Sequence, residues 1–193
     1  RSEAELHRAR IALTTLFGTG PTGAQARLRH IALIGLRGAG KSTLGRMLAD
    51  ELGVPFVEVG REIERVAGGS LAGIHALYGS GAYHRYERRA LQQVLAEHDD
   101  AVIATPGSIV SESANFSLLL SHCYTGWLKA SPREHMERVV AQGDLRPMGG
   151  ETGIEEAMQD LKRILKGRAA LYGKADFSVD TSGLTPEQAF AEL

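Results

Sequence analysis

The chain has 193 residues, with 22 lysines and arginines against 23 aspartates and glutamates and a formal net charge of -1. This length suits one domain with a sizeable core, and the charge balance excludes a broad basic surface for nucleic acid or anionic lipid. The lone cysteine, Cys123, excludes an internal disulfide and fits a reducing cytosol, and no apolar run approaches the ~18 residues of a membrane span. We therefore predict a cytoplasmic protein without a membrane partner.

The first 29 residues have the composition of a connection between domains. Residues 2–16 place apolar side chains among charges in the pattern of a short helix, and residues 17–23 then gather three glycines and one proline. We predict a linker over residues 1–29, which arrives from an upstream domain, and a ligand-binding domain over residues 30–193.

A phosphate-binding motif opens this domain. Residues 35–43 match G-x-x-x-x-G-K-S/T, between the apolar run 31–34 and the helix-patterned run 44–52. Its glycines let successive backbone N–H groups converge on a phosphate, and the following helix adds its partial positive charge. Lys41 is expected to reach the outer phosphates, and Ser42 is expected to ligate magnesium. The predicted phosphate-binding residues of the loop are Gly35, Arg37, Gly38, Ala39, Gly40, Lys41, Ser42 and Thr43.

From residue 30 onward, short apolar runs alternate with longer segments of helical period. This alternation is typical of parallel strands joined by crossover helices. The predicted strands cover residues 31–34, 55–59, 101–105, 124–129 and 177–179. The sequence therefore predicts an α/β fold, a three-layer α/β/α sandwich around a five-stranded parallel sheet.

Glycines and capping residues mark the predicted helices. Helical segments at 61–67, 71–78 and 82–98 are separated by glycine-containing breaks, of which the second is Gly79-Ser80-Gly81. A capping serine, a first-turn proline and a reciprocal glutamate open another helix at Ser131, and residues 185–188 repeat the device.

A loop rich in glycine separates two of these helices. Residues 143–153 contain four glycines, one proline and Arg146, and we predict that they form a mobile flap before a long helix over 154–172. A charge on an irregular loop has no packing role, so we expect Arg146 to close over phosphate.

The region from residue 30 to the end of the chain resembles a shikimate kinase. The phosphate loop carries the resemblance together with residues 56–64, 82–87, 102–110, 145–147 and 168–172. It implies a fold like that of nucleoside monophosphate kinases, ATP with magnesium, and a small hydroxylated ring acid as phosphoryl acceptor. It also implies that Arg168 is one of two arginines that bind the acceptor's carboxylate.

The acceptor side departs from the pattern of that family at three places. Glu58 and Gly60 stand where the family has Asp-x-Asp, whose second aspartate holds the acceptor hydroxyl, and His84 stands in place of the other carboxylate-binding arginine. Residues 106–108 replace a triple glycine, and misplacing such groups can lower phosphoryl transfer ~100-fold. We expect an altered acceptor pocket formed by Glu58, Gly60, His84, Glu87, Pro106, Gly107 and Ser108.

A retained phosphate loop beside an altered acceptor pocket is similar to the effector domain of benzoyl-CoA-responsive helix-turn-helix transcriptional regulators. This resemblance implies a domain that is not an enzyme and that binds benzoyl-CoA as the inducer of a repressor of aromatic catabolism. DNA would then be bound through an upstream helix-turn-helix domain, in a homodimeric full-length protein. Two alternatives stay open: an active kinase with a changed acceptor, in which Glu58 positions magnesium, and an oligomerisation module with an unused loop.

Overall fold

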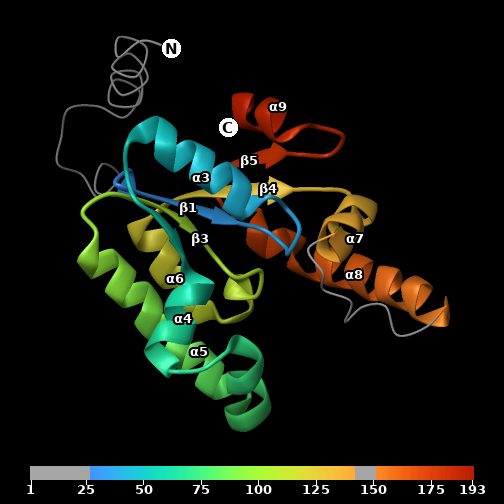
Figure 1. Ribbon diagram of the computed structural model, residues 1–193, viewed down its shortest axis with the longest axis horizontal. Helices are drawn as coiled ribbons and strands as arrows, with labels where there is room; N and C mark the ends of the chain where they lie inside the picture. Colours follow the sequence, from blue (N-terminus) through green and yellow to red (C-terminus); the bar gives the residue numbers. More distant parts are fainter. Residues whose placement is uncertain (1–26, 142–150) are drawn as a thin grey trace.

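The structure is a computed structural model that describes residues 27–141 and 151–193. Within them, five parallel strands form one sheet in the order β2-β3-β1-β4-β5 (Figure 1). The strands are β1 (His30–Ile34), β2 (Phe56–Glu58), β3 (Ala101–Ala104), β4 (Tyr124–Lys129) and β5 (Phe177–Asp180). The predicted five-stranded parallel sheet is confirmed, and β1 lies at its centre, between β3 and β4.

Helices connect the strands. In the described residues they are α3 (Lys41–Leu52), α4 (Val59–Ala67), α5 (Leu71–Glu97), α6 (Ser113–His122), α7 (Pro132–Ala141), α8 (Glu151–Tyr172), α9 (Pro186–Ala191) and the 3-10 turn η1 (Ile109–Ser111). None of them has the length and hydropathy that crossing a bilayer requires.

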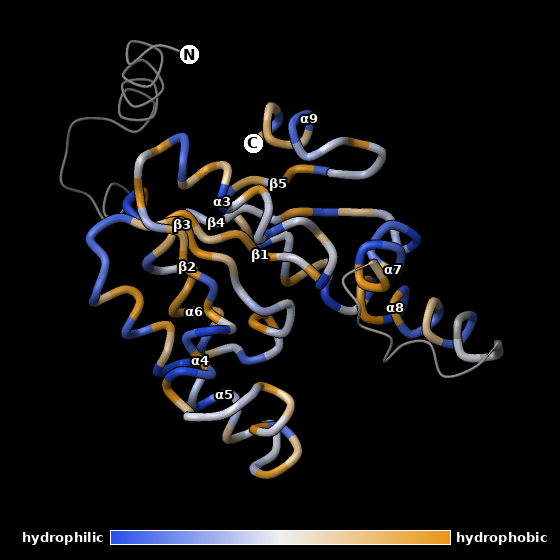
Figure 2. Tube along the Cα trace, in the orientation of Figure 1, coloured by the Kyte–Doolittle hydropathy of each residue, from blue (hydrophilic) through white to orange (hydrophobic). Residues whose placement is uncertain are grey.

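The sheet buries both of its faces. On β1, Ala32 and Ile34 belong to the core shared with α5, α6 and α8, whereas Leu33 belongs to the core shared with α3 and α9. This alternation follows from the period of two along a strand. Figure 2 shows the hydrophobic positions concentrated along the strands in the middle of the molecule. The predicted three-layer α/β/α sandwich is therefore confirmed.

The predicted caps form as expected. Ser131 and Glu134 exchange hydrogen bonds at the start of α7, where the Ser131 Oγ to Glu134 Oε2 distance is 2.6 Å. Thr185 and Gln188 form a complete capping box at the start of α9. Each pair satisfies backbone N–H groups that the first turn of a helix leaves without partners.

Several element boundaries differ from the prediction. Strand β2 ends at Glu58 and α4 begins at Val59, where a strand was predicted to continue. No bounds were predicted for helix α6, because a segment with leucines at three consecutive positions, 118–120, shows no amphipathic period. A single non-helical residue, Gly79, interrupts α5 where a longer glycine-containing break was predicted. Helix α8 begins at Glu151, inside the predicted flap.

Two predicted segments lie mostly outside the described residues. The structure does not describe residues 1–26 of the predicted linker. It also does not describe residues 143–150 of the predicted flap, which include Arg146. At the end of the predicted linker, Arg27 donates hydrogen bonds to the carbonyl of Cys123 and to the Asp176 carboxylate, at 2.8 and 2.6 Å from Nη2. Residue 27 is thus bonded to the residues that directly precede β4 and β5, and the linker prediction for residues 1–26 stays untested.

Candidate active site

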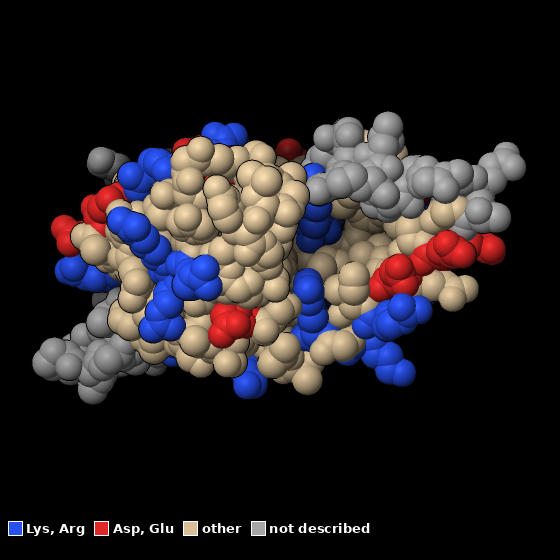
Figure 3. Space-filling view, turned by 90° about the horizontal axis from the view of Figure 1, so that it is seen from below, with Lys and Arg blue, Asp and Glu red and all other residues tan. Residues whose placement is uncertain are grey.

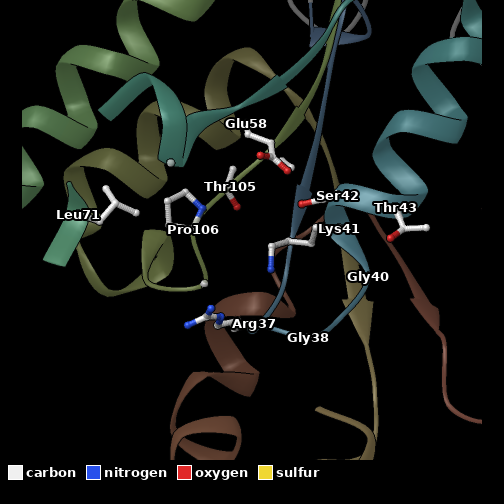
Figure 4. A pocket seen from close by; sticks show the side chains of 13 residues that line it. Arg37, Gly38, Gly40, Lys41, Ser42, Thr43, Glu58, Leu71, Thr105 and Pro106 are labelled. Carbon is white, nitrogen blue, oxygen red and sulfur yellow. The ribbon is translucent and has the colours of Figure 1, made fainter. Parts of the chain in front are cut away.

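A cavity of about 470 Å³ lies at the carboxyl ends of β1, β2 and β3 (Figure 4). In the order β2-β3-β1-β4-β5, the chain leaves β1 toward β2 and β3 on one side and later crosses to β4 and β5 on the other side. Open α/β sheets bind ligands in the crevice at such a change of direction. The lining residues are Arg37, Gly38, Gly40, Lys41, Ser42, Thr43, Glu58, Gly60, Leu71, Ala104, Thr105, Pro106 and Gly107. The cavity therefore joins most of the predicted phosphate loop to part of the predicted acceptor pocket.

The phosphate loop follows directly after β1 and ends where α3 begins, at Lys41. Gly38 and Gly40 adopt φ angles of 78° and 93°, in the left-handed region that favours glycine. A Cβ atom at Gly38 would lie 2.8 Å from the carbonyl oxygen of His135, so the position has no room for a side chain. The loop thus needs glycine at position 38 for its backbone angle and for its packing.

Lys41 turns its ammonium group into the loop. Its Nζ lies 2.8 Å from the carbonyl oxygen of Gly35 and 2.9 Å from that of Leu36. Burial, and to a smaller extent the positive charge of Arg37, together lower the pKa of Lys41 to about 8. A bound phosphate would raise the pKa of Lys41 again and favour its ammonium form, so this lysine is suited to bind an anion.

Glu58 provides the carboxylate of the opposite wall. Its side chain is 21% exposed and forms ion pairs with Arg46 at 3.2 Å and Arg61 at 3.0 Å. Figure 4 shows Glu58, Ser42 and Lys41 around the same space. The end of β2 thus brings a carboxylate to the cavity that also holds the lysine of the phosphate loop.

Other positions of that wall are mostly apolar or lack a side chain. Gly60 lines the cavity, and a Cβ atom there would lie 3.6 Å from Leu71 Cδ1, in ordinary contact. Sequence reasoning missed Leu71 and Thr105 as lining residues. Thr105 could have been found, because it ends the predicted strand 101–105 and the carboxyl ends of parallel strands form the ligand crevice.

Arg168 contacts the cavity wall by a hydrogen bond to the backbone of Gly107. Its Nη1 donates a hydrogen bond to the carbonyl of Gly107 at 3.0 Å, and the Tyr172 hydroxyl donates to the same oxygen at 2.7 Å. Burial raises the pKa of Tyr172, which keeps this hydroxyl protonated as a donor. The structure therefore brings Arg168 next to Gly107 and Pro106, as part of the wall rather than among the lining side chains.

His84 and Glu87 lie in a buried cluster outside the cavity lining. Glu87 is fully buried, and its Oε2 atom is 3.3 Å from His84 Nδ1 and 2.9 Å from Asn115 Nδ2. The other carboxylate oxygen, Oε1, has no hydrogen-bond partner in the described part of the chain. Tyr83 connects this cluster to the predicted pocket residue Ser108 by a hydrogen bond, and burial raises the pKa of Tyr83 to about 12.

A second cavity, of about 340 Å³, flanks the other side of the phosphate loop. Two predicted loop residues, Gly35 and Ala39, do not line the first cavity. Ala39 lines this second cavity, together with Gly38, Gly40 and Thr43. Arg138 and Pro186 are on its far wall. The loop thus lines two cavities. A ligand whose phosphate chain lies on the loop could place a group in each of them.

Charge on this part of the surface favours an anion. Arg37 and Lys41 line the main cavity. In the space-filling view, basic side chains appear on the walls of a hollow between the body of the molecule and the projecting arm that holds α8 (Figure 3). Oxyanions are attracted to such a hollow through Coulomb interactions.

The donor set fits magnesium held together with a ligand phosphate. No cluster of three or more histidine, cysteine, aspartate or glutamate side chains that could hold a metal occurs in residues 27–141 and 151–193. Magnesium usually keeps several waters and takes one or two protein oxygens plus substrate phosphates. The Ser42 hydroxyl and the Glu58 carboxylate, which line one cavity, are donors of that kind.

This fold and site define a P-loop α/β protein whose cavity is suited to phosphate-bearing ligands. A family model for shikimate kinase matches residues 37–193, and the chain belongs to the shikimate kinase family. The predicted shikimate-kinase-like fold is therefore confirmed.

Relatives of known name and structure agree with this assignment. The shikimate kinase of Thermodesulfovibrio yellowstonii is 33% identical over 161 residues, which cover 83% of this chain and 90% of the relative. That of Caulobacter vibrioides is 34% identical over 169 residues, 88% of this chain and 82% of the relative. Shikimate kinase from Acinetobacter baumannii in complex with shikimate has a similar structure, with a TM-score of 0.75, 26% identity, and coverage of 89% of this chain and 94% of that chain.

The hypothesis of a benzoyl-CoA-sensing regulator domain is wrong, because the family model and these relatives identify a family of kinases. The prediction that the chain is not an enzyme is wrong with it, as are benzoyl-CoA and DNA as predicted partners, and the predicted homodimer loses its basis. The error has a physical cause. Changes of side chain at Glu58, Gly60, His84 and Pro106 were interpreted as loss of the acceptor site, yet all of these residues except His84 still line one cavity with the intact phosphate loop.

Proposed function

We propose that this chain is a magnesium- and ATP-dependent kinase that transfers a phosphoryl group to a hydroxyl of a small carboxylic acid. The observation that carries the proposal is the single cavity in which the phosphate loop faces the carboxylate of Glu58. The family supports ATP as donor and makes shikimate the first acceptor to test.

In this proposal the chain's own residues hold the phosphate chain and neutralise its charge. The N-terminus of α3 and the backbone of the loop bind the phosphate oxygens, and Lys41 supplies a point charge to the transferred group. A bound magnesium ion would neutralise further phosphate charge, with Ser42 and Glu58 as protein donors. Catalysis then rests mainly on positioning and electrostatics, as phosphoryl transfer requires.

The acceptor would lie between Glu58, Thr105 and the Pro106–Gly107 wall. Ion pairs with Arg46 and Arg61 orient the Glu58 carboxylate, and each of its oxygens keeps a lone pair that can accept a hydrogen bond from the attacking hydroxyl. Gly60 contributes no side chain to this function. Arg168, bound to the Gly107 carbonyl, places a cation next to this wall and supports an acidic acceptor.

The test is a coupled assay of ADP release with shikimate and a panel of small hydroxy acids. We expect ADP release to depend on one acceptor and to require magnesium, with a phosphorylated product detectable by mass spectrometry. Lys41→Ala should abolish turnover, and Lys162→Ala, which changes an exposed lysine of α8, should leave it unchanged.

Each outcome of this assay decides between the alternatives. Turnover of shikimate identifies the acceptor, and turnover of another hydroxy acid alone identifies a kinase with a changed acceptor. ATP hydrolysis at one slow rate with every acceptor and without any would overturn the proposal.

A further inference from the structure

Helix α7 packs directly against the back of the phosphate loop. Its residue His135 is only 1% exposed, and the Nδ1 atom lies 2.8 Å from the carbonyl oxygen of Arg37. A carbonyl oxygen can only accept a hydrogen bond, so Nδ1 carries the hydrogen and donates it. A buried imidazole is therefore bonded to the backbone of the loop, 98 positions away in the sequence.

The contact between α7 and the loop is close. The Cβ position of Gly38 is 2.8 Å from the carbonyl oxygen of His135 and 3.2 Å from Val139 Cγ2. Arg138 bonds the next carbonyl of the loop, with its Nη1 atom 3.3 Å from the oxygen of Gly38 and 3.0 Å from Thr181 Oγ1. The carbonyls of Arg37 and Gly38 are thus each bonded to a side chain of α7, and these two side chains lie one helical turn apart.

Peptide geometry gives this contact a consequence on the ligand side. In a planar trans peptide, the C=O of one residue and the N–H of the next point in opposite directions. Because His135 holds the Arg37 carbonyl on the side of α7, the N–H of Gly38 faces away from α7. Of the two cavities that Gly38 lines, only the one of about 470 Å³ has no residue of α7 in its lining, so this N–H is directed to that cavity, where phosphate would bind.

We propose that His135 is a positioning residue of the phosphate loop: its Nδ1–H fixes the Arg37–Gly38 peptide so that the Gly38 N–H donates to bound phosphate. The imidazole is suited to this as a neutral donor. Burial lowers the pKa of His135 and outweighs the hydrogen bond to the Arg37 carbonyl, which raises it. The nearby charges of Lys41 and Arg138 also lower this pKa, so the neutral ring is favoured beside Lys41.

The proposal rests on the proposed function only in requiring a phosphate-bearing ligand, so the experiment measures binding rather than turnover. Titration calorimetry with Mg-ATP and, separately, with pyrophosphate compares wild type with His135→Leu and His135→Asn. Leucine removes the donor, whereas the asparagine amide N–H restores it. The matched control is His30→Leu. His30 is also buried and bonded through Nε2 to a backbone carbonyl, that of His98 at 2.8 Å, but it lies at the amino end of β1.

We expect His135→Leu to weaken binding of both probes on the order of tenfold, since one oriented donor is lost, and His135→Asn to stay within about threefold of wild type. His30→Leu should lower the thermal midpoint without changing either affinity. Equal affinities for His135→Leu and wild type would overturn the inference, as would a loss in His30→Leu as large as that in His135→Leu. If wild type binds pyrophosphate but not Mg-ATP, the proposed function fails while the pyrophosphate comparison still decides the role of His135.

Discussion

The lowered pKa of Lys41 predicts that nucleotide binding weakens above neutral pH. Burial lowers this pKa to about 8, whereas a free lysine titrates near 10.4. If phosphate binds only the ammonium form, the competent fraction of the free protein falls from ~0.9 at about pH 7 to ~0.1 at about pH 9. The affinity for Mg-ATP should therefore fall about tenfold over this range, against only ~4% for a lysine of ordinary pKa.

The assay is titration calorimetry across this pH range, in two buffers of different ionisation enthalpy. A bound phosphate raises the pKa of Lys41 again, so binding near pH 8 should take up about half a proton. Lys41→Met removes the titrating group and should bind weakly at every pH. Lys162→Met, at an exposed position of α8, should keep the wild-type profile and so controls for titration of the nucleotide itself.

The reasoning would be refuted if wild type bound Mg-ATP with the same affinity at both ends of the pH range. It would also be refuted if the uptake of protons persisted unchanged in Lys41→Met, because another group would then be the source.

Four further predictions concern the site and the fold. Gly38→Ala should weaken Mg-ATP binding by at least about tenfold in calorimetry, because φ is 78° there and a Cβ would lie 2.8 Å from a backbone oxygen; unchanged affinity would contradict the loop geometry. Glu58→Gln should lower kcat ~100-fold or more and weaken Mg-ATP binding by a smaller factor, since the amide keeps one oxygen donor for magnesium; an unchanged kcat would exclude Glu58 from the reaction. Hydrogen bonds from Ser131, and then from the backbone N–H of Gly183, lower the pKa of Glu134 to about 2 from 4.5. Its contribution to the free energy of unfolding is therefore present above about pH 4.5 and lost as pH falls through about 2, so urea unfolding should show Glu134→Gln less stable than wild type at neutral pH and equal to it below about pH 2. Leu33→Ala, at a fully buried position of β1, should lower the free energy of unfolding by about 2–5 kcal/mol, and a loss under about 1 kcal/mol would mean that the site collapses around the change.

Much of the fold could be predicted because local signals and tertiary packing agree. Strand β4 has the predicted bounds, residues 124–129, and the caps at Ser131 and Thr185 open α7 and α9 as expected. The strand with the largest error, β2, ends early because Val59 is needed in α4, where it is fully buried. That requirement comes from packing and leaves no mark in the local sequence.

The site was predicted less completely than the fold. The phosphate loop is one continuous motif, so its residues could be named from the sequence alone. His84 and Glu87 could not be placed, because the partner that holds them, Asn115, lies on α6, a helix without an amphipathic period. The error on function has a similar origin: a missing aspartate at position 60 says nothing about what Glu58, two residues earlier, can do in the same cavity.

The non-helical residue Gly79 divides α5 into two segments. Before it, Leu71 lines the cavity, and Leu77 and Tyr78 are 76% and 65% exposed; after it, Ala90 and Leu91 are fully buried in the core. Leu71 and Ile74, before the break, pack against the same core as Leu91, so the first segment of α5 connects the cavity wall to the packing under the sheet. A change of residue at Leu71 would therefore alter the cavity and the core of the fold together.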